Sequence, residues 1–273
     1  MLSELSLTLV AQLLALGLCT GFLAGLLGIG GGMLMVPFLS AILTHHGVDA
    51  AFAVKMAIAT SMATILVTSL SSVRAHHRRG AVNWPLVRGI APGLVIGGLL
   101  AGAGAFALLK GQVLALLFAG FITLSAVRMV YRSKTVATRK LPGRVGQAAV
   151  GTGIGFLSGL LGAGGAFVSV PFMTSCGVSI HTAVATSAAL GFPIALSNTI
   201  GYLIGGWSLP PALPGAVGFL FVPALLVIGV GSVVMAPIGV RTAHRLNKVH
   251  LQRVFAALLI TLAAYMLYRA LMS

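Results

Sequence analysis

The chain has 273 residues, of which 58% are hydrophobic and only 7% are charged, and its mean hydropathy is +1.09. Soluble domains carry about 25% charged residues, so this composition excludes a soluble globular fold and leaves no length for a sizeable soluble domain. Seventeen lysines and arginines stand against two acids, Glu4 and Asp49. The basic residues lie in short breaks between apolar runs. This argues against nucleic-acid binding and is typical of cytoplasmic loops that face anionic lipid headgroups.

Apolar stretches of about 20 residues, the length that crosses a hydrocarbon core, recur along the chain. The first region, Leu5 to Thr44, is an apolar helix that meets a glycine cluster and continues as a short apolar piece, and Gly146 to Ser175 has the same form. Both are predicted to be broken helices or re-entrant hairpins of undetermined depth. Uninterrupted spans are expected at Ala51 to Val73, Trp84 to Leu109, Gln112 to Tyr131, Ala183 to Ile204, Leu213 to Gly239 and Val254 to Leu271. The fold class is therefore predicted to be an all-α polytopic membrane protein.

An internal repeat divides the chain into two related halves. The segment GFLAGLLGIGGGMLMVPF (Gly21 to Phe38) matches GFLSGLLGAGGAFVSVPF (Gly155 to Phe172) at twelve of eighteen positions. The similarity continues in an Ala-Thr-Ser triplet after each segment and in the last span of each half. We therefore predict a first transmembrane repeat at residues 1–132, a basic cytoplasmic linker at 133–145 and a second transmembrane repeat at 146–273.

Loop charge predicts how the two repeats are oriented. The basic loop Arg74 to Arg79 and the linker are expected on the cytoplasmic side, where lysine and arginine accumulate. By alignment, this loop corresponds to uncharged Gly201 to Pro210, whereas sparse Lys110 corresponds to basic Arg241 to Lys248. Equivalent loops thus face opposite sides. This predicts an inverted repeat in a bacterial inner membrane, with both termini outside and the substrate near the bilayer midplane.

The two glycine clusters are the main candidates for a substrate site. Glycine lets the backbone leave helical geometry and approach a ligand closely, and a helix that starts inside the membrane directs its positive dipole end toward an anion. Tight helix crossing is the alternative role of such glycines. Two clusters at equivalent positions, each followed by a proline, favour a transport cavity. The candidate substrate-binding glycines are Gly28, Gly30 and Gly31 in the first half and Gly162, Gly164 and Gly165 in the second.

Hydroxyl groups inside two spans form a second set of candidates. Thr60 and Ser61 in the first half are matched by Thr186 and Ser187 in the second. A hydroxyl in an apolar helix bonds either to its own backbone or to a ligand. Because the repeat pairs these residues, we include all four as candidate substrate ligands.

Asn198 and Lys55 complete the candidate substrate-binding residues. Asn198 brings an amide into a span. Lys55, which aligns with His181, offers a cation to an anionic substrate or extends toward the membrane interface. His45 and His46 are adjacent rather than one helical turn apart, so no metal site is expected.

Acidic residues are missing from the middle of every span. A buried carboxylate proton relay is therefore not expected. Acid–base and Ser-His-Asp catalysis are disfavoured for the same reason, and neither glycine cluster has the spacing of a nucleotide-binding loop. The protein is accordingly expected not to be an enzyme, to have no catalytic residues and to use no cofactor.

The doubled GLLGxGG...VPF motif, each copy followed by an ATS triplet, resembles the sulfite exporter TauE/SafE family of permeases over nearly the whole chain. This resemblance implies an inner-membrane permease for small anions such as sulfite, sulfoacetate, thiosulfate or other organic anions. It places the family motif on the candidate glycines with Pro37 and Pro171, and on the triplets around Thr60 and Thr186. Since the second cluster reads GAGGA where the first reads GIGGG, the two half-sites are not expected to be chemically equivalent.

The sequence thus predicts a transporter of a small anion that works by alternating access between two repeats. A passive anion channel is the first alternative and a membrane-embedded enzyme is the second. A structural or assembly subunit is the third. Homo-oligomerisation is compatible with each.

Overall fold

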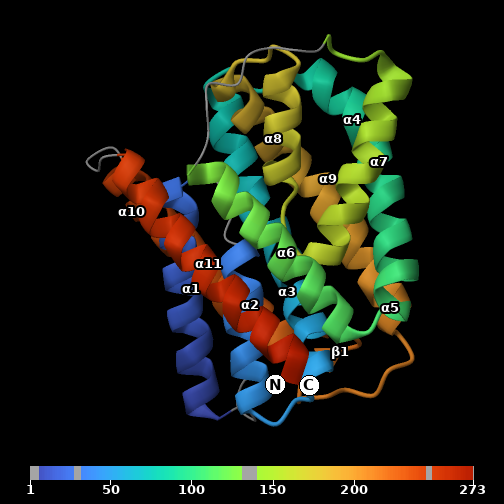
Figure 1. Ribbon diagram of the computed structural model, residues 1–273, viewed down its shortest axis with the longest axis vertical. Helices are drawn as coiled ribbons and strands as arrows, with labels where there is room; N and C mark the ends of the chain where they lie inside the picture. Colours follow the sequence, from blue (N-terminus) through green and yellow to red (C-terminus); the bar gives the residue numbers. More distant parts are fainter. Residues whose placement is uncertain (1–5, 28–31, 131–139, 244–247, 273) are drawn as a thin grey trace.

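The computed structural model describes residues 6–27, 32–130, 140–243 and 248–272, and nearly all of its ordered elements are helices (Figure 1). The first half contains α1 (Leu7–Leu27), α2 (Gly32–His45), α3 (Ala50–Arg78), α4 (Trp84–Leu99), the π-helical segment η2 (Leu100–Ala105), α5 (Phe106–Leu108) and α6 (Gly111–Val130). The second half contains α7 (Arg144–Leu161), α8 (Ala166–Ser175), α9 (Ile180–Gly206), the strands β1 (Ala216–Val217) and β2 (Leu220–Phe221), α10 (Val222–Ala243) and α11 (Lys248–Met272).

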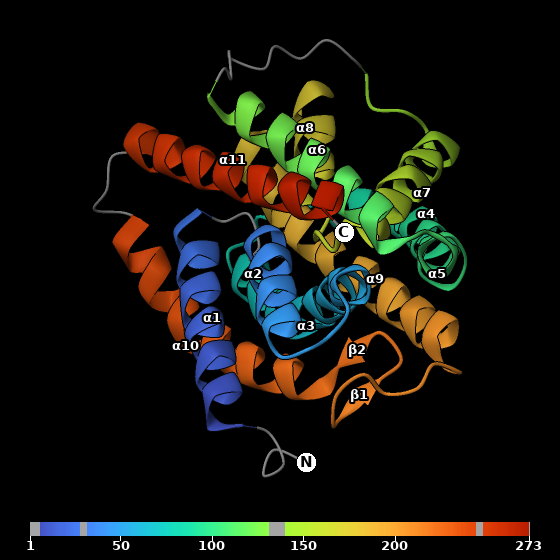
Figure 2. The ribbon, with the colours of Figure 1, turned by 60° about the horizontal axis from the view of Figure 1, so that its bottom comes forward.

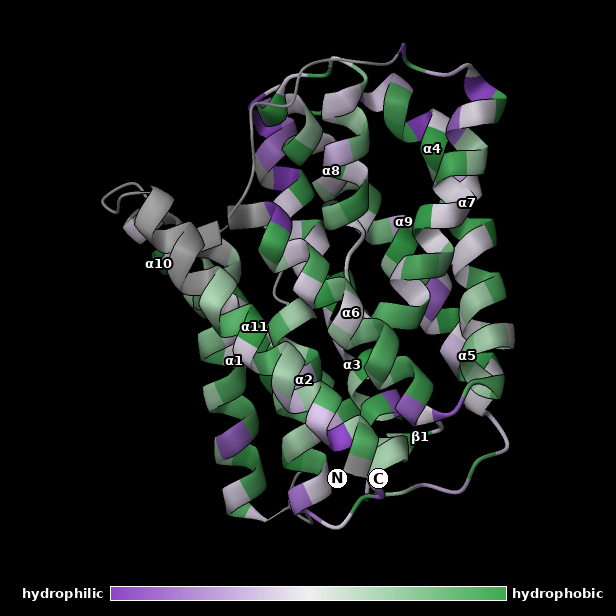
Figure 3. Ribbon diagram, in the orientation of Figure 1, coloured by the Kyte–Doolittle hydropathy of each residue, from purple (hydrophilic) through white to green (hydrophobic). Residues whose placement is uncertain are grey.

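Six described helical segments are long and apolar enough to cross a membrane, which confirms the all-α polytopic fold class. Hydrophobic residues cover most of the helix lengths, and hydrophilic residues gather mainly at the two ends of the molecule (Figure 3). The six segments are Leu7–Ala24, Ala50–Arg78, Trp84–Leu108, Gly111–Arg128, Ile180–Gly206 and Val222–Gly239. Helices α2 and α8, with 14 and 10 residues, are too short to cross alone.

The predicted span Leu213 to Gly239 was wrong at its beginning. Helix α10 starts at Val222, and the residues before it form a turn and an antiparallel hairpin in which Ala216 pairs with Phe221. Gly215 and Gly218 adopt positive φ values of 85° and 55°, which a helix does not contain. Hydropathy does not separate a short apolar hairpin from the first turns of an apolar helix.

Helices of one half pack mainly against helices of the other half. Figure 2 shows α1 beside α10, α4 beside α7, α3 beside α9 and α6 beside α11, and these pairs are in extensive contact. In the alignment of the repeats, α1 corresponds to α7 and α4 to α10. The α1–α10 contact and the α7–α4 contact are therefore the same contact made once by each half.

Close glycine contacts make these two crossings equivalent in detail. A Cβ on Gly21 would overlap the Ser232 backbone of α10, and a Cβ on Gly155 would overlap the Leu94 backbone of α4. Small residues four apart let membrane helices approach closely, which increases van der Waals contact where the hydrophobic effect contributes little. The glycines at these contacts are Gly17 and Gly21 on α1, and Gly151 and Gly155 on α7.

The two short helices occupy opposite halves of the molecule. In Figure 1, α2 lies in the lower half and α8 in the upper half, and the two begin near the middle. The start of α1, the end of α11 and the β1–β2 hairpin all lie at the lower end. The fold thus directs the N-termini of two half-helices toward its centre from opposite ends.

Candidate functional site

The glycine turn of the second half joins α7 to α8. Helix α7 ends at Leu161, and Gly162 and Gly165 follow with φ values of 64° and 73°, in the left-handed region that favours glycine. Gly162 N donates a hydrogen bond to Ser158 O at 2.9 Å, and Gly165 precedes the first residue of α8. The sequence prediction of a helix broken at these glycines is confirmed. The matching candidates Gly28, Gly30 and Gly31 lie outside the described residues.

The beginning of α2 meets this turn at the centre of the molecule. A Cβ on Gly32 would lie 2.7 Å from Gly162 O, so the two segments touch through backbone. The fully buried Ser61 of α3 lies between them, with its Oγ 3.2 Å from Gly162 O and 3.4 Å from Gly32 O. A hydroxyl has one proton, so Ser61 donates to one carbonyl at a time. Two of the predicted site residues, Ser61 and Gly162, are thus brought together.

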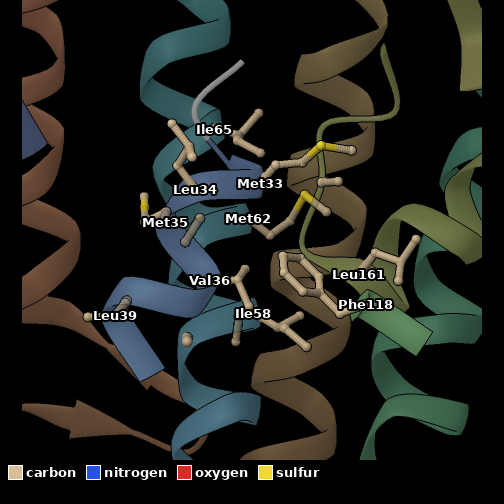
Figure 4. Close-up of a cluster of buried hydrophobic side chains, with 14 of the residues drawn as sticks. Met33, Leu34, Met35, Val36, Leu39, Ile58, Met62, Ile65, Phe118 and Leu161 are labelled. Carbon is tan, nitrogen blue, oxygen red and sulfur yellow. The ribbon is translucent and has the colours of Figure 1, made fainter. Parts of the chain in front are cut away.

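Apolar side chains fill the space beside the start of α2 in this conformation. Met33, Met62 and Phe118 are buried, and so is Ile65. Figure 4 shows these side chains gathered around the first turn of α2 and the adjoining part of α3. The meeting point of the two halves is therefore closed by apolar groups, two of which are flexible methionines.

Thr60 and Thr186 each link a helix of one half to a helix of the other. Thr60 Oγ1 accepts a hydrogen bond from Phe221 N at 3.0 Å, and Thr186 Oγ1 accepts one from Asn83 N at 3.1 Å. Both threonines are fully buried. Phe221 immediately precedes α10 and Asn83 immediately precedes α4, so the two bonds occupy equivalent positions. In this conformation both hydroxyl groups hold helices together, and their contact with a substrate stays a prediction.

Ser187 has a partner that sequence reasoning missed. Its Oγ lies 2.8 Å from the Oγ of Ser169 on α8, and both side chains are buried. The first half has Met35 at the position that aligns with Ser169, so the signal was present in the repeat alignment. The half of the site around α8 is consequently more polar than the half around α2.

Asn198, on α9, contacts α7 at Gly159, about one helical turn before the glycine turn. A Cβ on Gly159 would overlap Asn198 Oδ1, which has no hydrogen-bond partner within the described part of the chain. Its Nδ2 donates to Ile194 O at 2.8 Å. Tyr202, another residue that the sequence analysis missed, donates its hydroxyl proton to Gly159 O. The two α9 side chains form a buried polar contact with α7.

Lys55 is separated from the glycine turns. It lies in the second turn of α3, where its Nζ donates to Ala107 O at 3.0 Å and lies 5.3 Å from the ring centre of Phe219. His181, its counterpart in the alignment, is exposed at the start of α9. The structure therefore places Lys55 near the lower end of the molecule, away from the meeting point of the two halves.

The chain is similar over nearly its whole length to a family of membrane proteins. The family model for the sulfite exporter TauE/SafE matches residues 13–266. A probable membrane transporter protein of Haemophilus influenzae is 32% identical over 261 residues, covering 95% of this chain and 98% of its own length. A probable membrane transporter protein of Methanocaldococcus jannaschii is 25% identical, covering 96% of both chains.

Among solved structures, no match to the chain was found. The family match extends over both repeats and includes both glycine motifs. The protein is accordingly a membrane transporter, and the chain belongs to the sulfite exporter TauE/SafE family.

Proposed function

We propose that the protein is a bacterial inner-membrane permease for a small anion: sulfite, or another sulfur-containing or organic anion such as sulfoacetate or thiosulfate. The observation that carries the proposal is the contact between the start of α2 and the glycine turn before α8. Helix N-termini carry positive partial charge, and half-helices that end at the membrane centre bind anionic groups of substrates in transporters. The described spans contain no acidic residue that would repel an anion.

The exchanged contacts between the two halves support alternating access as the mechanism. Each half uses its first helix and its ATS threonine to hold the other half. Because the two sets of contacts occupy equivalent positions, opening one set while the other stays closed would expose the centre to one side of the membrane at a time. The buried methionines beside α2 close the route between them, and their flexible side chains can move aside at low cost.

Gly164 offers the sharpest test of the glycine turn. Its φ is not positive, and a Cβ there would lie 3.5 Å from the Ile65 side chain, so substitution does not strain the backbone. We expect Gly164→Leu to fill the space beside the turn and reduce anion uptake into proteoliposomes at least tenfold, with membrane insertion retained. Gly153→Leu is the matched control, since Gly153 lies on α7 with open space around its Cα.

The substrate screen compares sulfite, sulfoacetate, thiosulfate and simple carboxylates. Saturable uptake of at least one of them, lost in Gly164→Leu and kept in Gly153→Leu, supports the proposal. Flux that never saturates with concentration would show that the protein is a passive channel and not a transporter. Chemical change of the solute would point to an enzyme, and uptake in Gly164→Leu equal to that of the unmodified protein would limit the glycine turn to packing.

A further inference from the structure

A cavity of about 410 Å³ lies at the lower end of the molecule, between the starts of α3 and α6. It is a shallow pocket that opens widely to the exterior. The residues that line it are Asp49, Ala51, Phe52, Lys55, Lys110, Gly111 and Gln112. Two of the seven are lysines, and one, Asp49, is one of the two acids of the chain.

Lys55 is a partly buried cation without an ion-pair partner among the residues that the structure describes. One of the three N–H groups of its ammonium donates to Ala107 O, and the rings of Phe106 and Phe219 lie 5.9 and 5.3 Å away. Asp49 lines the same cavity and caps α3 by accepting from Phe52 N, and with two lysines against this one carboxylate the lining keeps a net charge of +1; no described atom other than Ala107 O accepts from Lys55. The remaining donors of Lys55 are therefore available to an anion.

Lys110 lies in the same cavity because the start of α6 packs against the start of α3. A Cβ on Gly111 would overlap the backbone of Ala51, so only glycine allows this approach. The contact places Lys110, which the sequence indicated only as a loop residue, in one cavity with Lys55. Both helices also present their positive N-terminal ends here.

A second, smaller cavity adjoins the first. It has a volume of about 20 Å³, room for one water molecule, and it shares Ala51, Gly111 and Gln112 with the larger cavity. Its other walls include Ser40 and Thr44 of α2, the half-helix whose start meets the glycine turn. The two cavities thus lie side by side at the lower end, and the smaller one reaches the last turns of α2.

We propose that Lys55 and Lys110 form an oxyanion-binding site at this mouth of the transporter, which collects the anionic substrate before it passes between the halves. The site takes a small group with two or three anionic oxygens, such as sulfite, a sulfonate or a carboxylate. This inference rests on the proposed anion transport. A lipid phosphate presents the same oxygen chemistry, so the test distinguishes a dissolved anion from a lipid headgroup.

Protection from chemical labelling tests the site without requiring transport. The full-length protein, in nanodiscs of purely zwitterionic lipid, is treated with an amine-acylating reagent with and without sulfite, and labelling of each lysine is read by mass spectrometry. We expect millimolar sulfite to slow acylation of Lys110 at least threefold and to leave the exposed Lys140 unchanged. Equal labelling of Lys110 with and without sulfite overturns the proposal. Protection that appears only after anionic lipid is added assigns the site to a headgroup and also overturns it.

Uptake kinetics of lysine variants provide a second test of the site. Charge-assisted hydrogen bonds are strong enough that Lys55→Gln should raise the KM for uptake about tenfold, with a smaller rise of about threefold for the exposed Lys110→Gln and kcat nearly unchanged. Arg128→Gln, which removes the same charge at the far end of α6, is the matched control and should leave KM unchanged. Lys110→Arg, which keeps a cation at this position, should have the KM of the unmodified protein.

The two arms separate this inference from the proposed function. Sulfite protection of Lys110 in a protein that transports none of the screened anions keeps the site and removes the transport proposal. Saturable transport with no protection and with unchanged KM in both lysine variants keeps the transport proposal and removes the site. A fall in kcat at constant KM in both variants also contradicts the site, since it points to structural damage.

Discussion

The hydroxyl groups of Thr60 and Thr186 each accept a hydrogen bond from a backbone N–H group of the opposite half. The donors are Phe221 N and Asn83 N, each just before a helix of the opposite half. Phe221 is fully buried, so its N–H group would be costly to leave unpaired, whereas Asn83 is half-buried. These two side chains therefore stabilise the contact between the halves by a bond that the helix itself cannot provide.

Replacing either threonine by valine keeps the shape of the side chain and removes the acceptor. We expect Thr60→Val to lower the free energy of unfolding by about 1–3 kcal/mol, because the buried Phe221 N–H loses its partner, and Thr186→Val to lower it by about 1 kcal/mol, because Asn83 is half-buried. Thermal unfolding in detergent measures the effect. Thr60→Ser should be close to the unmodified protein. Thr123→Val, on an exposed hydroxyl that bonds to its own helix, should have little effect, and a loss no larger than that of Thr123→Val would refute the role of both threonines.

Ser169 and Ser187 are expected to act as a coupled pair. Either serine changed alone to alanine leaves the other hydroxyl buried without this partner, at a cost of about 1 kcal/mol. Changing both removes the unsatisfied group, so the double variant should cost less than the sum of the single variants. A double-mutant cycle on unfolding midpoints measures the coupling, and strictly additive losses would show that the two hydroxyl groups do not interact.

At the scale of helices, the glycines of α1 and α7 determine how closely the halves approach. Gly21 faces the Ser232 backbone so closely that a methyl group has no space. We expect Gly21→Ala to separate α1 from α10 and to lower the free energy of unfolding by about 1–3 kcal/mol, the usual cost of overpacking. The measurement is the unfolding midpoint in detergent.

Gly120→Ala is the control for this helix contact. Gly120 lies within α6, and no atom lies within 4 Å of the position that an alanine methyl group would take there. Alanine at this position should therefore be neutral or stabilise the protein by up to about 1 kcal/mol. If both alanine variants unfold at the same midpoint, the close crossing of α1 and α10 does not limit stability.

At the scale of the whole molecule, the positions of basic residues predict the orientation in the membrane. Arg74, Arg78 and Arg79 lie at the end of α3 that is opposite to the lower end of the molecule, where α1 begins and α11 ends (Figure 1). Because arginine-rich loops stay in the cytoplasm, both termini are expected outside. This orientation also places the Lys55–Lys110 cavity on the outer face.

Reporter fusions test this orientation. Alkaline phosphatase fused after residue 273 should be active, because that enzyme folds outside the cytoplasm, and a green fluorescent protein at the same point should be dark. The reverse pair of signals would invert the topology. A phosphatase fused within Arg74 to Arg79 serves as the opposite control and should be inactive.

Several features of the fold could be predicted from the sequence because they depend on local properties. Hydropathy over about 20 residues indicates spans, and the doubled glycine motif marks the breaks, as the turn at Gly162 to Gly165 confirms. The start of α10 could not be predicted this way, since residues 213–221 are apolar whether they form a hairpin or a helix. Local composition indicates that a segment is buried in a membrane or in protein, but not which structure it adopts there.

For the candidate site, the sequence indicated residues but not their contacts. Ser61 and Gly162 were predicted separately, and the structure brings them within 3.2 Å. Lys55 was grouped with them, yet it lies in a different place beside Lys110. Alignment of the repeats shows which residues are equivalent, but equivalence does not say which residues touch.

By itself, the sequence determined that this chain is a membrane protein of two similar sequence halves, and it predicted a glycine-broken helix in each, which the structure describes in the second half. Those properties follow from hydrophobic length and from glycine's freedom of backbone conformation, which belong to single segments. Only the tertiary structure decided that each half holds the other through exchanged helices, threonine hydrogen bonds and glycine contacts. The two threonine bonds join residues 103 and 161 positions apart, so their energy depends on the packing of the whole chain and not on any one segment.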